Sequence, residues 1–167
     1  MLKLIFSCLL FALAPARAEA PNFSELTATS EKIARTYYDY YIQLDFEKMA
    51  PLLAENASFF DPTAQQIFGA QETSGKAAVL ENFKTAYASI TQMKIHAANA
   101  YFSGQYGIFS GQLDWSFKSG PEPNLIHIKK MPLTVTIKVE NGVVTEHRDY
   151  ADYRVFTKQY EMQTANQ

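Results

Sequence analysis

Three aspartates, Asp61, Asp114 and Asp149, are the residues of this sequence best suited to chemistry. Proline pushes the residue before it toward extended geometry, so Pro62 should hold Asp61 in a turn or facing a cavity, at the end of a short strand. Carboxylates that share a dry pocket raise one another's pKa, and one of them then becomes a usable acid or base near neutral pH. The aspartates therefore indicate acid–base chemistry, provided that the fold brings them together.

Each candidate also has a purely structural interpretation. An aspartate before proline, such as Asp61, is typical of a turn, and Asp114 could be an exposed residue at a sheet edge. Asp149, which is flanked by Arg148, could be half of a cross-strand ion pair worth under about 1 kcal/mol. Tyr37 lies on the apolar face of a helical pattern, where a core role is common.

Other chemistries have little support in the sequence. His96 and His147 lack the close-spaced partners of a metal site, so no metal is predicted. The sequence has no glycine-rich phosphate loop, nucleophile elbow or Cys/His pair, and we expect no cofactor. A formal charge of −2 and the lack of a lysine or arginine run argue against a nucleic-acid surface.

Residues 1–18 have the pattern of a secretory leader, with one early lysine, an apolar run and an Ala16-Arg17-Ala18 cleavage site. The apolar run is shorter than the roughly 20 residues of a membrane span, and no later stretch is long enough. Cleavage would remove the only cysteine, Cys8. We therefore expect an exported protein, periplasmic or secreted, that folds without disulfides.

The remaining chain is predicted to contain one domain over residues 29–157, between a lead-in (19–28) and a polar tail (158–167). Its first half reads, in order, as a helix from Thr29 or Ser30 to Leu44, a shorter helix after Asp45, strands at 57–61 and 65–68, and a helix from Thr73 or Ser74 to Ile90.

The second half reads as sheet, because apolar and polar residues alternate over 93–97, 109–117 and 130–139. Asn141-Gly142 predicts a hairpin into a last strand from Val143 to about Phe156. Helices first and strands last indicate an α+β fold with the helices on one face of the sheet. The apolar side of residues 109–117 then either packs on the helices or meets a second subunit.

The order and spacing of several motifs resemble a known superfamily. The motifs are Leu44-Asp45-Phe46, Ala57 to Pro62, Gly75-Lys76, Asn141-Gly142 and His147-Arg148-Asp149-Tyr150. From about Ser30 to Phe156 the chain resembles nuclear-transport-factor-2-like domains, in the SnoaL-like and ketosteroid-isomerase-like branch. The resemblance implies a cone-shaped barrel in which three N-terminal helices pack on a curved, mostly antiparallel sheet around a pocket, often in a homodimer.

The resemblance to ketosteroid isomerases implies that Asp61 is a general base that moves a proton next to a carbonyl. It places the tyrosine of the oxyanion hole at Tyr37. The second, neutral acid of that oxyanion hole is replaced by Thr134, whose hydroxyl donates one hydrogen bond but is a far weaker acid.

Limonene-epoxide hydrolases of the same superfamily have an Arg-Asp-Tyr sequence that resembles Arg148-Asp149-Tyr150. This resemblance implies a water-activating carboxylate at Asp149 and an acid at Asp114. The bridging arginine of those enzymes is replaced here by Gln112. Phe59 and Asp61 stand where those enzymes have the tyrosine and asparagine that hold the water.

We expect one pocket to collect the candidates. The catalytic candidates are Asp61, Tyr37, Asp149 and Asp114, and the ligand-binding candidates are Gln112, Thr134, Phe59 and His147. Such a pocket suits a small, largely apolar or aromatic molecule and carboxylate-mediated chemistry of the isomerase or hydrolase type, and replacing Asp61 with Asn should then abolish turnover. The alternatives are an exported binder without catalysis and a dimeric interaction module.

Overall fold

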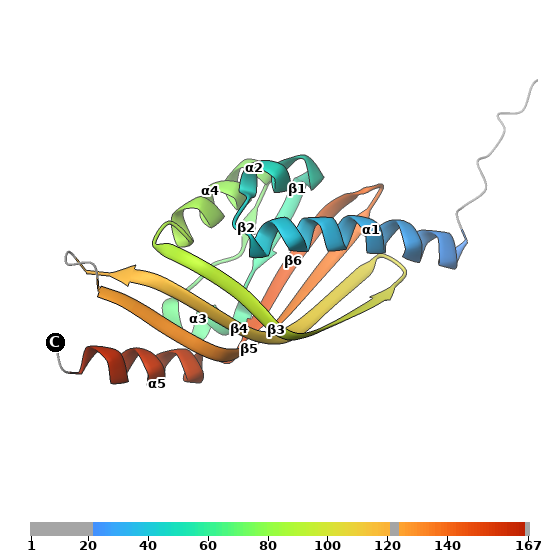
Figure 1. The fold of residues 1–167 in the computed structure, drawn as a ribbon. Helices are drawn as coiled ribbons and strands as arrows, with labels where there is room; N and C mark the ends of the chain where they lie inside the picture. The colour runs from blue at the N-terminus through green and yellow to red at the C-terminus, as the bar shows by residue number, and fades with distance from the viewer. Residues whose placement is uncertain (1–21, 121–123, 166–167) are drawn as a thin grey trace, which may run out of the picture.

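The computed structural model describes residues 22–120 and 124–165, and the expected leader lies outside these ranges. The fold is α+β, with helices packed on one curved six-stranded sheet that does not close into a barrel (Figure 1). The elements are α1 (Phe23–Ile42), α2 (Phe46–Met49), a 3-10 turn (Ala50–Leu52), β1 (Leu53–Phe60), α3 (Pro62–Phe68), β2 (Thr73–Ser74), α4 (Lys76–Ala86), β3 (Ile90–Ser103), β4 (Tyr106–Ser119), β5 (Asn124–Glu140), β6 (Val143–Ala151) and α5 (Tyr153–Thr164).

The sheet has the order β2-β1-β6-β5-β4-β3. Neighbouring strands are antiparallel, except that β1 runs parallel to β6. The β5–β6 hairpin turns at Asn141-Gly142 with both residues at positive φ, as the sequence predicts. The mostly antiparallel α+β fold is therefore confirmed.

Helix α1 begins at Phe23, earlier than Thr29 or Ser30. The reason is its cap, because the Asn22 side chain accepts a hydrogen bond from the Glu25 N–H at 2.9 Å. Along its length α1 buries Ala34, Tyr37, Tyr38 and Tyr41 against the sheet.

The strand predicted at 65–68 is wrong, because Pro62–Phe68 forms helix α3. Asp61 caps this helix by accepting hydrogen bonds from the Thr63 and Ala64 N–H groups, and Pro62 occupies the first turn, where its missing N–H costs nothing. The helix ends at Gly69, whose φ of 68° suits a residue without a side chain. Thr73–Ser74, expected to cap a helix, forms β2 instead.

The last strand ends at Ala151, so its predicted continuation to Phe156 is wrong, and the polar tail is largely helix α5. Asp152 caps α5. Tyr153, Phe156 and Tyr160 share one side of this helix, and Phe156 and Tyr160 lie against Trp115 or Phe117 of β4.

The two faces of the sheet differ in cover. We call the face that carries Phe109, Leu113 and Val135 the inner face, and the opposite one the outer face. Phe109 stacks on Tyr38 of α1 with ring centroids 4.0 Å apart, and both Phe109 and Leu113 are buried. Of the two arrangements that the sequence left open, the apolar side of β4 thus packs on the protein's own helices.

Candidate active site

A buried carboxylate lies where α1 crosses the inner face. Asp149 projects from β6 and is 3% exposed. Its Oδ2 accepts a hydrogen bond from the Tyr41 hydroxyl at 2.6 Å, and its Oδ1 lies 2.8 Å from His147 Nε2. Residues 147 and 149 are two apart on one strand, so both side chains face the helices.

The hydrogen bonds continue on both sides of Asp149. The Tyr41 hydroxyl lies 2.6 Å from the Tyr87 hydroxyl of the α4 C-cap, and Tyr37 Oη lies 3.0 Å from His147 Nδ1. Tyr41 gives its proton to Asp149, so Tyr87 must donate to Tyr41. With Nε2–H of His147 directed at Asp149, Nδ1 accepts from Tyr37, a tautomer assigned from this network.

The tyrosines of the network stay protonated over a wide pH range. Burial raises the pKa of Tyr37, Tyr41 and Tyr87 well above the usual value, and the negative charge of Asp149 raises it further. Each hydroxyl therefore remains a hydrogen-bond donor. The network places two hydrogen-bond donors, Tyr41 and His147, on the Asp149 side chain and so fixes its orientation.

Two cavities lie beside this network. The first, the aromatic cavity, has a volume of about 350 Å³, and its walls include Phe59, Phe68, Tyr87, Trp115 and Tyr153, with Asp61. The second, the acid chamber, has about 30 Å³ and is lined by Asp149, Tyr41 and several apolar side chains. The two share Tyr87, Trp115 and Tyr153 as walls. A small molecule in the first cavity would lie next to the chamber that holds the carboxylate.

Asp61 lines the aromatic cavity, but its oxygens are occupied. Oδ1 accepts from the Thr63 N–H, the Thr63 hydroxyl and the Ala64 N–H at 2.5 to 2.8 Å, and Oδ2 accepts from the Tyr153 hydroxyl at 2.7 Å. Asp61 therefore joins α3 to α5. Both interpretations of the sequence apply to this residue, because it caps a helix and also faces a cavity.

Three of the predicted pocket residues lie elsewhere. Gln112 and Thr134 line a shallow groove of about 750 Å³ on the outer face, and Asp114 projects from that face as well. The prediction that one pocket collects all the candidates is therefore wrong, because these three lie on the opposite face of the sheet from the others. The reason is strand alternation, because Leu113 and Leu133 point into the core and their sequence neighbours must point away.

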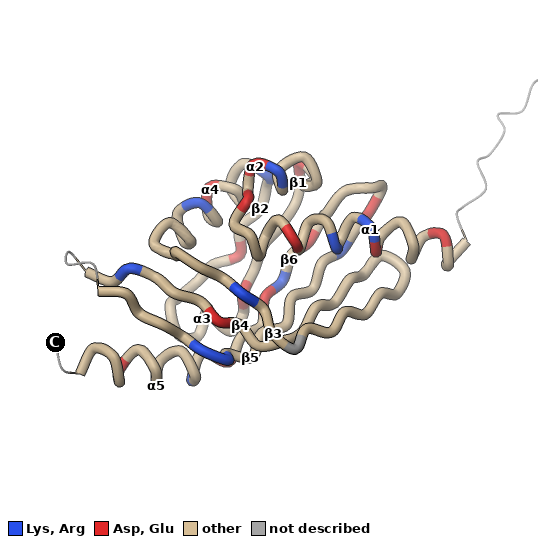
Figure 2. Tube along the Cα trace, in the orientation of Figure 1, with Lys and Arg blue, Asp and Glu red and all other residues tan. Residues whose placement is uncertain are grey.

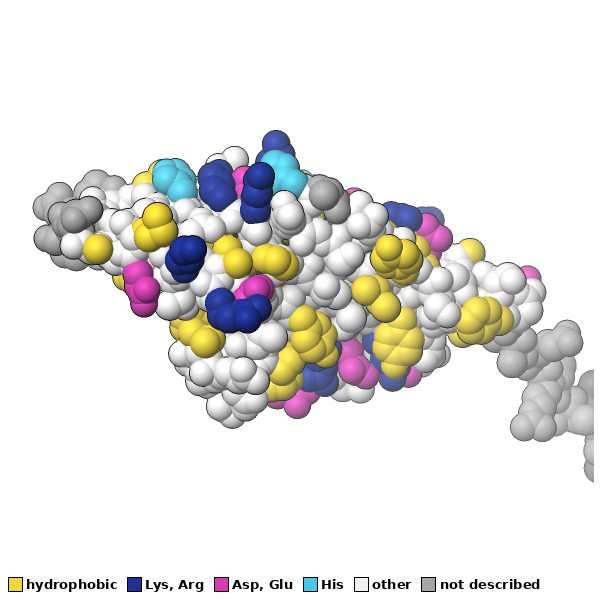
Figure 3. Space-filling model, turned by 90° about the horizontal axis from the view of Figure 1, so that it is seen from below, with side chains coloured by type: hydrophobic (Ala, Val, Ile, Leu, Met, Phe, Trp, Pro, Cys, Tyr) yellow, Lys and Arg dark blue, Asp and Glu magenta, His cyan; other side chains and the backbone are white. Residues whose placement is uncertain are grey.

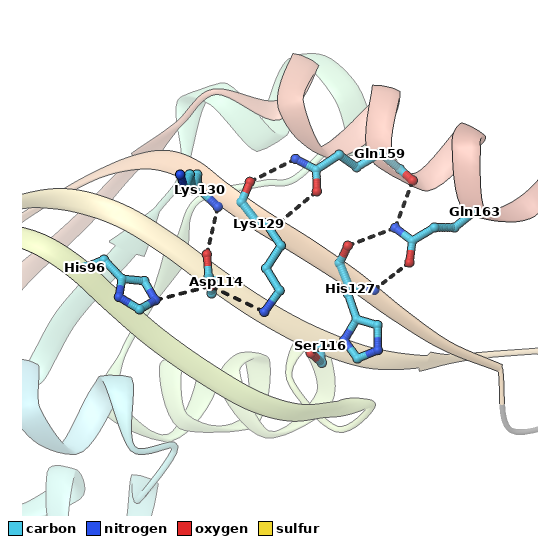
Figure 4. Close-up of polar contacts among 8 residues, drawn as sticks. All are labelled: His96, Asp114, Ser116, His127, Lys129, Lys130, Gln159 and Gln163. Carbon is cyan, nitrogen blue, oxygen red and sulfur yellow. Dashed lines mark hydrogen bonds and ion pairs between the residues drawn. The ribbon is translucent and has the colours of Figure 1, made fainter.

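Asp114 binds a bulged segment of β5 on the outer face (Figure 4). Lys129 and Lys130 both lie opposite Asp114 in a β-bulge, and Lys130 has a φ of 54°. Asp114 Oδ1 accepts the Lys130 N–H at 2.8 Å, and Oδ2 contacts His96 and Lys129. Burial opposes ionisation of Asp114, but the hydrogen bonds from Lys130 and Lys129 lower its pKa below the usual value.

The other candidates lie at or behind the cavities. Tyr37 and His147 are fully buried behind Asp149 and support it. Phe59 forms part of the aromatic wall and lies edge-to-face with His147 at 5.1 Å. Proximity is thus established for Tyr37, Phe59, Asp61, His147 and Asp149, whereas their chemical roles stay predictions.

Four residues of the site were not among the candidates: Tyr41, Tyr87, Trp115 and Tyr153. Sequence periodicity could have indicated the first three. Tyr41 shares a helix face with Tyr37, and Tyr87 belongs to the apolar face of the helix that became α4. Trp115 alternates with Asp114 along its strand. Tyr153 was predicted to lie in a strand, so no feature of the sequence indicated its contact with Asp61.

Within the described ranges, no cluster of three or more His, Cys, Asp or Glu side chains could hold a metal ion. In the same part of the chain, no helix is both long and apolar enough to cross a membrane.

The helix-covered curved sheet with a buried pocket is a fold that the chain shares with solved nuclear-transport-factor-2-like proteins. More specifically, the chain belongs to the SnoaL-like domain family, whose model matches residues 34–147. No curated protein matches the sequence at a significant level.

Solved structures share the fold at low sequence identity. A candidate SnoaL-like polyketide cyclase from Shewanella putrefaciens CN-32 is 20% identical, with a TM-score of 0.69 over 80% of this chain and 96% of that one. A candidate ketosteroid isomerase from Kribbella flavida DSM 17836 is 21% identical, with a TM-score of 0.55 over 75% and 79%. TerC, co-crystallised with polyporic acid, is 13% identical, with a TM-score of 0.62 over 80% and 98%.

Proposed function

We propose that the protein holds a small, largely apolar molecule in the aromatic cavity and transfers a proton on it with Asp149. The observation that carries this proposal is a carboxylate, 3% exposed, that lines a chamber against an aromatic cavity. TerC supports it at the level of fold, since a protein of this shape was crystallised with polyporic acid.

Asp149 would act as the base in this reaction. A carboxylate has about four acceptor positions, and Tyr41 and His147 use two of them, so lone pairs remain for a proton from the ligand. The two donors fix the orientation of the carboxylate, and the surrounding apolar side chains exclude water. A base positioned in this way contributes typically about 10²–10⁴-fold to a rate.

The test uses a generic carbonyl compound, 1-tetralone, whose hydrogens next to the carbonyl can exchange with deuterium. Exchange in D₂O is followed by proton NMR with and without protein. We expect Asp149→Asn to lower the protein-dependent exchange rate at least about 10²-fold. Asp114→Asn on the outer face is the matched control and should leave the rate unchanged. Equal rates in wild type and Asp149→Asn would refute Asp149 as the base.

Asp61 is the second candidate base, because it faces the aromatic cavity. Its use as a base would require the Tyr153 hydroxyl to leave Oδ2. The same assay on Asp61→Asn separates the two candidates: loss of exchange in this variant alone assigns the base to Asp61.

A non-catalytic binder of the same fold is the alternative function. Such a binder would be stabilised by 1-tetralone, more strongly at higher concentrations of the compound, without accelerating the exchange. Thermal unfolding with increasing 1-tetralone, run beside the exchange assay, distinguishes binding alone from binding with turnover.

We further propose export to the periplasm or medium after cleavage following Ala18, and association into a homodimer. The leader pattern supports the first proposal. Tyr101 and Ile108, cross-strand neighbours 60% and 38% exposed, support a contact through the outer face. The mass of the mature chain tests the cleavage site. Sedimentation of Tyr101→Lys tests the interface, and an unchanged sedimentation coefficient would argue against it.

A further inference from the structure

The indole N–H of Trp115 is buried without an acceptor in the described part of the chain. Trp115 is the only tryptophan of the sequence and forms a wall of both the aromatic cavity and the acid chamber. A buried donor without a partner is uncommon in folded proteins and needs a specific explanation.

The indole ring is held in place by aromatic neighbours. Phe117 of β4 and Phe156 of α5 lie with ring centroids 5.6 and 5.7 Å from it. Rotating the N–H toward solvent would break these contacts, so the side chain cannot easily satisfy its donor on its own.

The other donors around the acid chamber are already committed. The hydroxyl of Tyr41 donates to Asp149, that of Tyr87 then donates to Tyr41, and that of Tyr153 donates to Asp61. The remaining side chains of its lining are carboxylate or apolar. Among the described side chains that line the chamber, Trp115 therefore carries the one uncommitted donor.

We propose that Trp115 determines ligand specificity by donating its Nε1–H to an oxygen of the ligand that accepts a hydrogen bond, such as a carbonyl oxygen. The inference rests on the proposed function, because it requires a small molecule in the aromatic cavity. It adds a selection rule: apolar ligands with an acceptor oxygen bind in preference to hydrocarbons of the same shape, because only the former pair the buried donor.

The first test observes the donor directly in the wild-type protein. With one tryptophan, a nitrogen-15 correlation spectrum contains a single indole N–H signal. The probes are 1-tetralone and tetralin, which share a ring skeleton but differ in the carbonyl. We expect 1-tetralone to move the indole proton signal downfield and tetralin not to do so. Binding of 1-tetralone without this downfield shift would overturn the inference.

The second test uses Trp115→Phe, which keeps an aromatic ring and removes the N–H. The ratio of the 1-tetralone and tetralin affinities, measured by calorimetry, should fall about tenfold relative to wild type. A ratio that changes less than about twofold would overturn the inference. If this variant does not fold, the spectrum of the wild type decides alone.

The outcomes separate the inference from the proposed function. If both probes bind and neither the indole signal nor the affinity ratio responds, the donor role is wrong and the proposed function stands. If neither probe binds the wild type, the cavity does not take molecules of this class, and both are overturned.

Discussion

The three candidate aspartates, Asp61, Asp114 and Asp149, lie in different environments. Their sequence neighbours do not indicate which environment each one occupies. Asp149 is held by Tyr41 and His147 beside a chamber, whereas Asp114 stabilises a β-bulge on the outer face. Asp61 caps α3 and accepts a hydrogen bond from α5. Burial and partners, rather than residue type, therefore make Asp149 the strongest candidate base.

At the same scale, Asp61→Ala should destabilise the protein by about 2–3 kcal/mol, since it removes a helix cap and leaves the Tyr153 hydroxyl without its acceptor. Urea unfolding followed by circular dichroism measures the loss. The matched control is Asp45→Ala, which removes the cap of α2 at a more exposed position and should cost less stability than Asp61→Ala. Equal losses in the two variants would contradict a special role for the Asp61–Tyr153 link.

Helix α5 shows how an element can cover a sheet edge. β6 pairs with β5 only from Leu133 onward, so the first half of β5 has a free edge. The Gln159 side chain donates to the carbonyl and accepts from the N–H of Lys129, and Gln163 does the same at His127, with distances of 2.8 to 2.9 Å (Figure 4). Two side-chain amides thereby replace the missing strand.

We expect the double variant Gln159→Ala/Gln163→Ala to lose about 1–3 kcal/mol of stability, because the four hydrogen bonds to the β5 backbone disappear. The exposed edge should also increase aggregation. Urea unfolding and light scattering measure the two effects. Glu161→Ala, an exposed change on the same helix, is the control and should alter neither by much. A double variant that behaves like this control would show that the edge needs no cover.

Sequence periodicity predicted the elements whose burial is one-sided. The helices around Tyr37 and Val79 and the strands β4 and β5 follow from their spacing, since each buries one regular face, whereas β6 follows from the Asn141-Gly142 hairpin. It failed where capping decides the structure. Asp61-Pro62 starts a helix, and Asp152 starts another whose aromatic residues looked like the end of a strand.

The site could be predicted only in part, because it depends on which face of the sheet each residue occupies. Alternation grouped Gln112 with Asp114 correctly, but it did not show whether that group faced the helices. Contacts of α1 with the sheet settle this point by burying Phe109 and Leu113. Tyr41 and Tyr87 meet only in three dimensions, 46 residues apart in sequence.

At the scale of the whole molecule, the distribution of charged and apolar side chains decides which face can meet a partner. In the described part of the chain, acidic and basic residues are interspersed along helices and strands (Figure 2), in keeping with a formal charge of −2. Seen from below, hydrophobic side chains are exposed between groups of basic ones (Figure 3). The outer face carries the exposed side chains of Tyr101 and Ile108, whereas α1 packs on the inner face.

Five tyrosines make the stability of the whole fold depend on pH in the alkaline range. Burial is the first cause that raises the pKa of Tyr37, Tyr38, Tyr41, Tyr87 and Tyr153 above the ordinary value of about 10. Below pH 10 the folded and unfolded states both keep these protons, so ionisation of the tyrosines does not lower the free energy of unfolding. Above it the unfolded state releases protons that the folded state retains, and the free energy of unfolding falls with rising pH.

The decrease should approach about 1.4 kcal/mol per pH unit for each tyrosine, and several acting together should unfold the protein within one or two units above pH 10. Urea midpoints measured between pH 8 and 11 give the slope. Tyr38→Phe removes one of the five groups and should make the slope shallower by about one tyrosine's share. A midpoint that stays constant to pH 11 would mean that the tyrosines ionise without unfolding, and the buried hydrogen-bonded network around Asp149 would then be open to solvent.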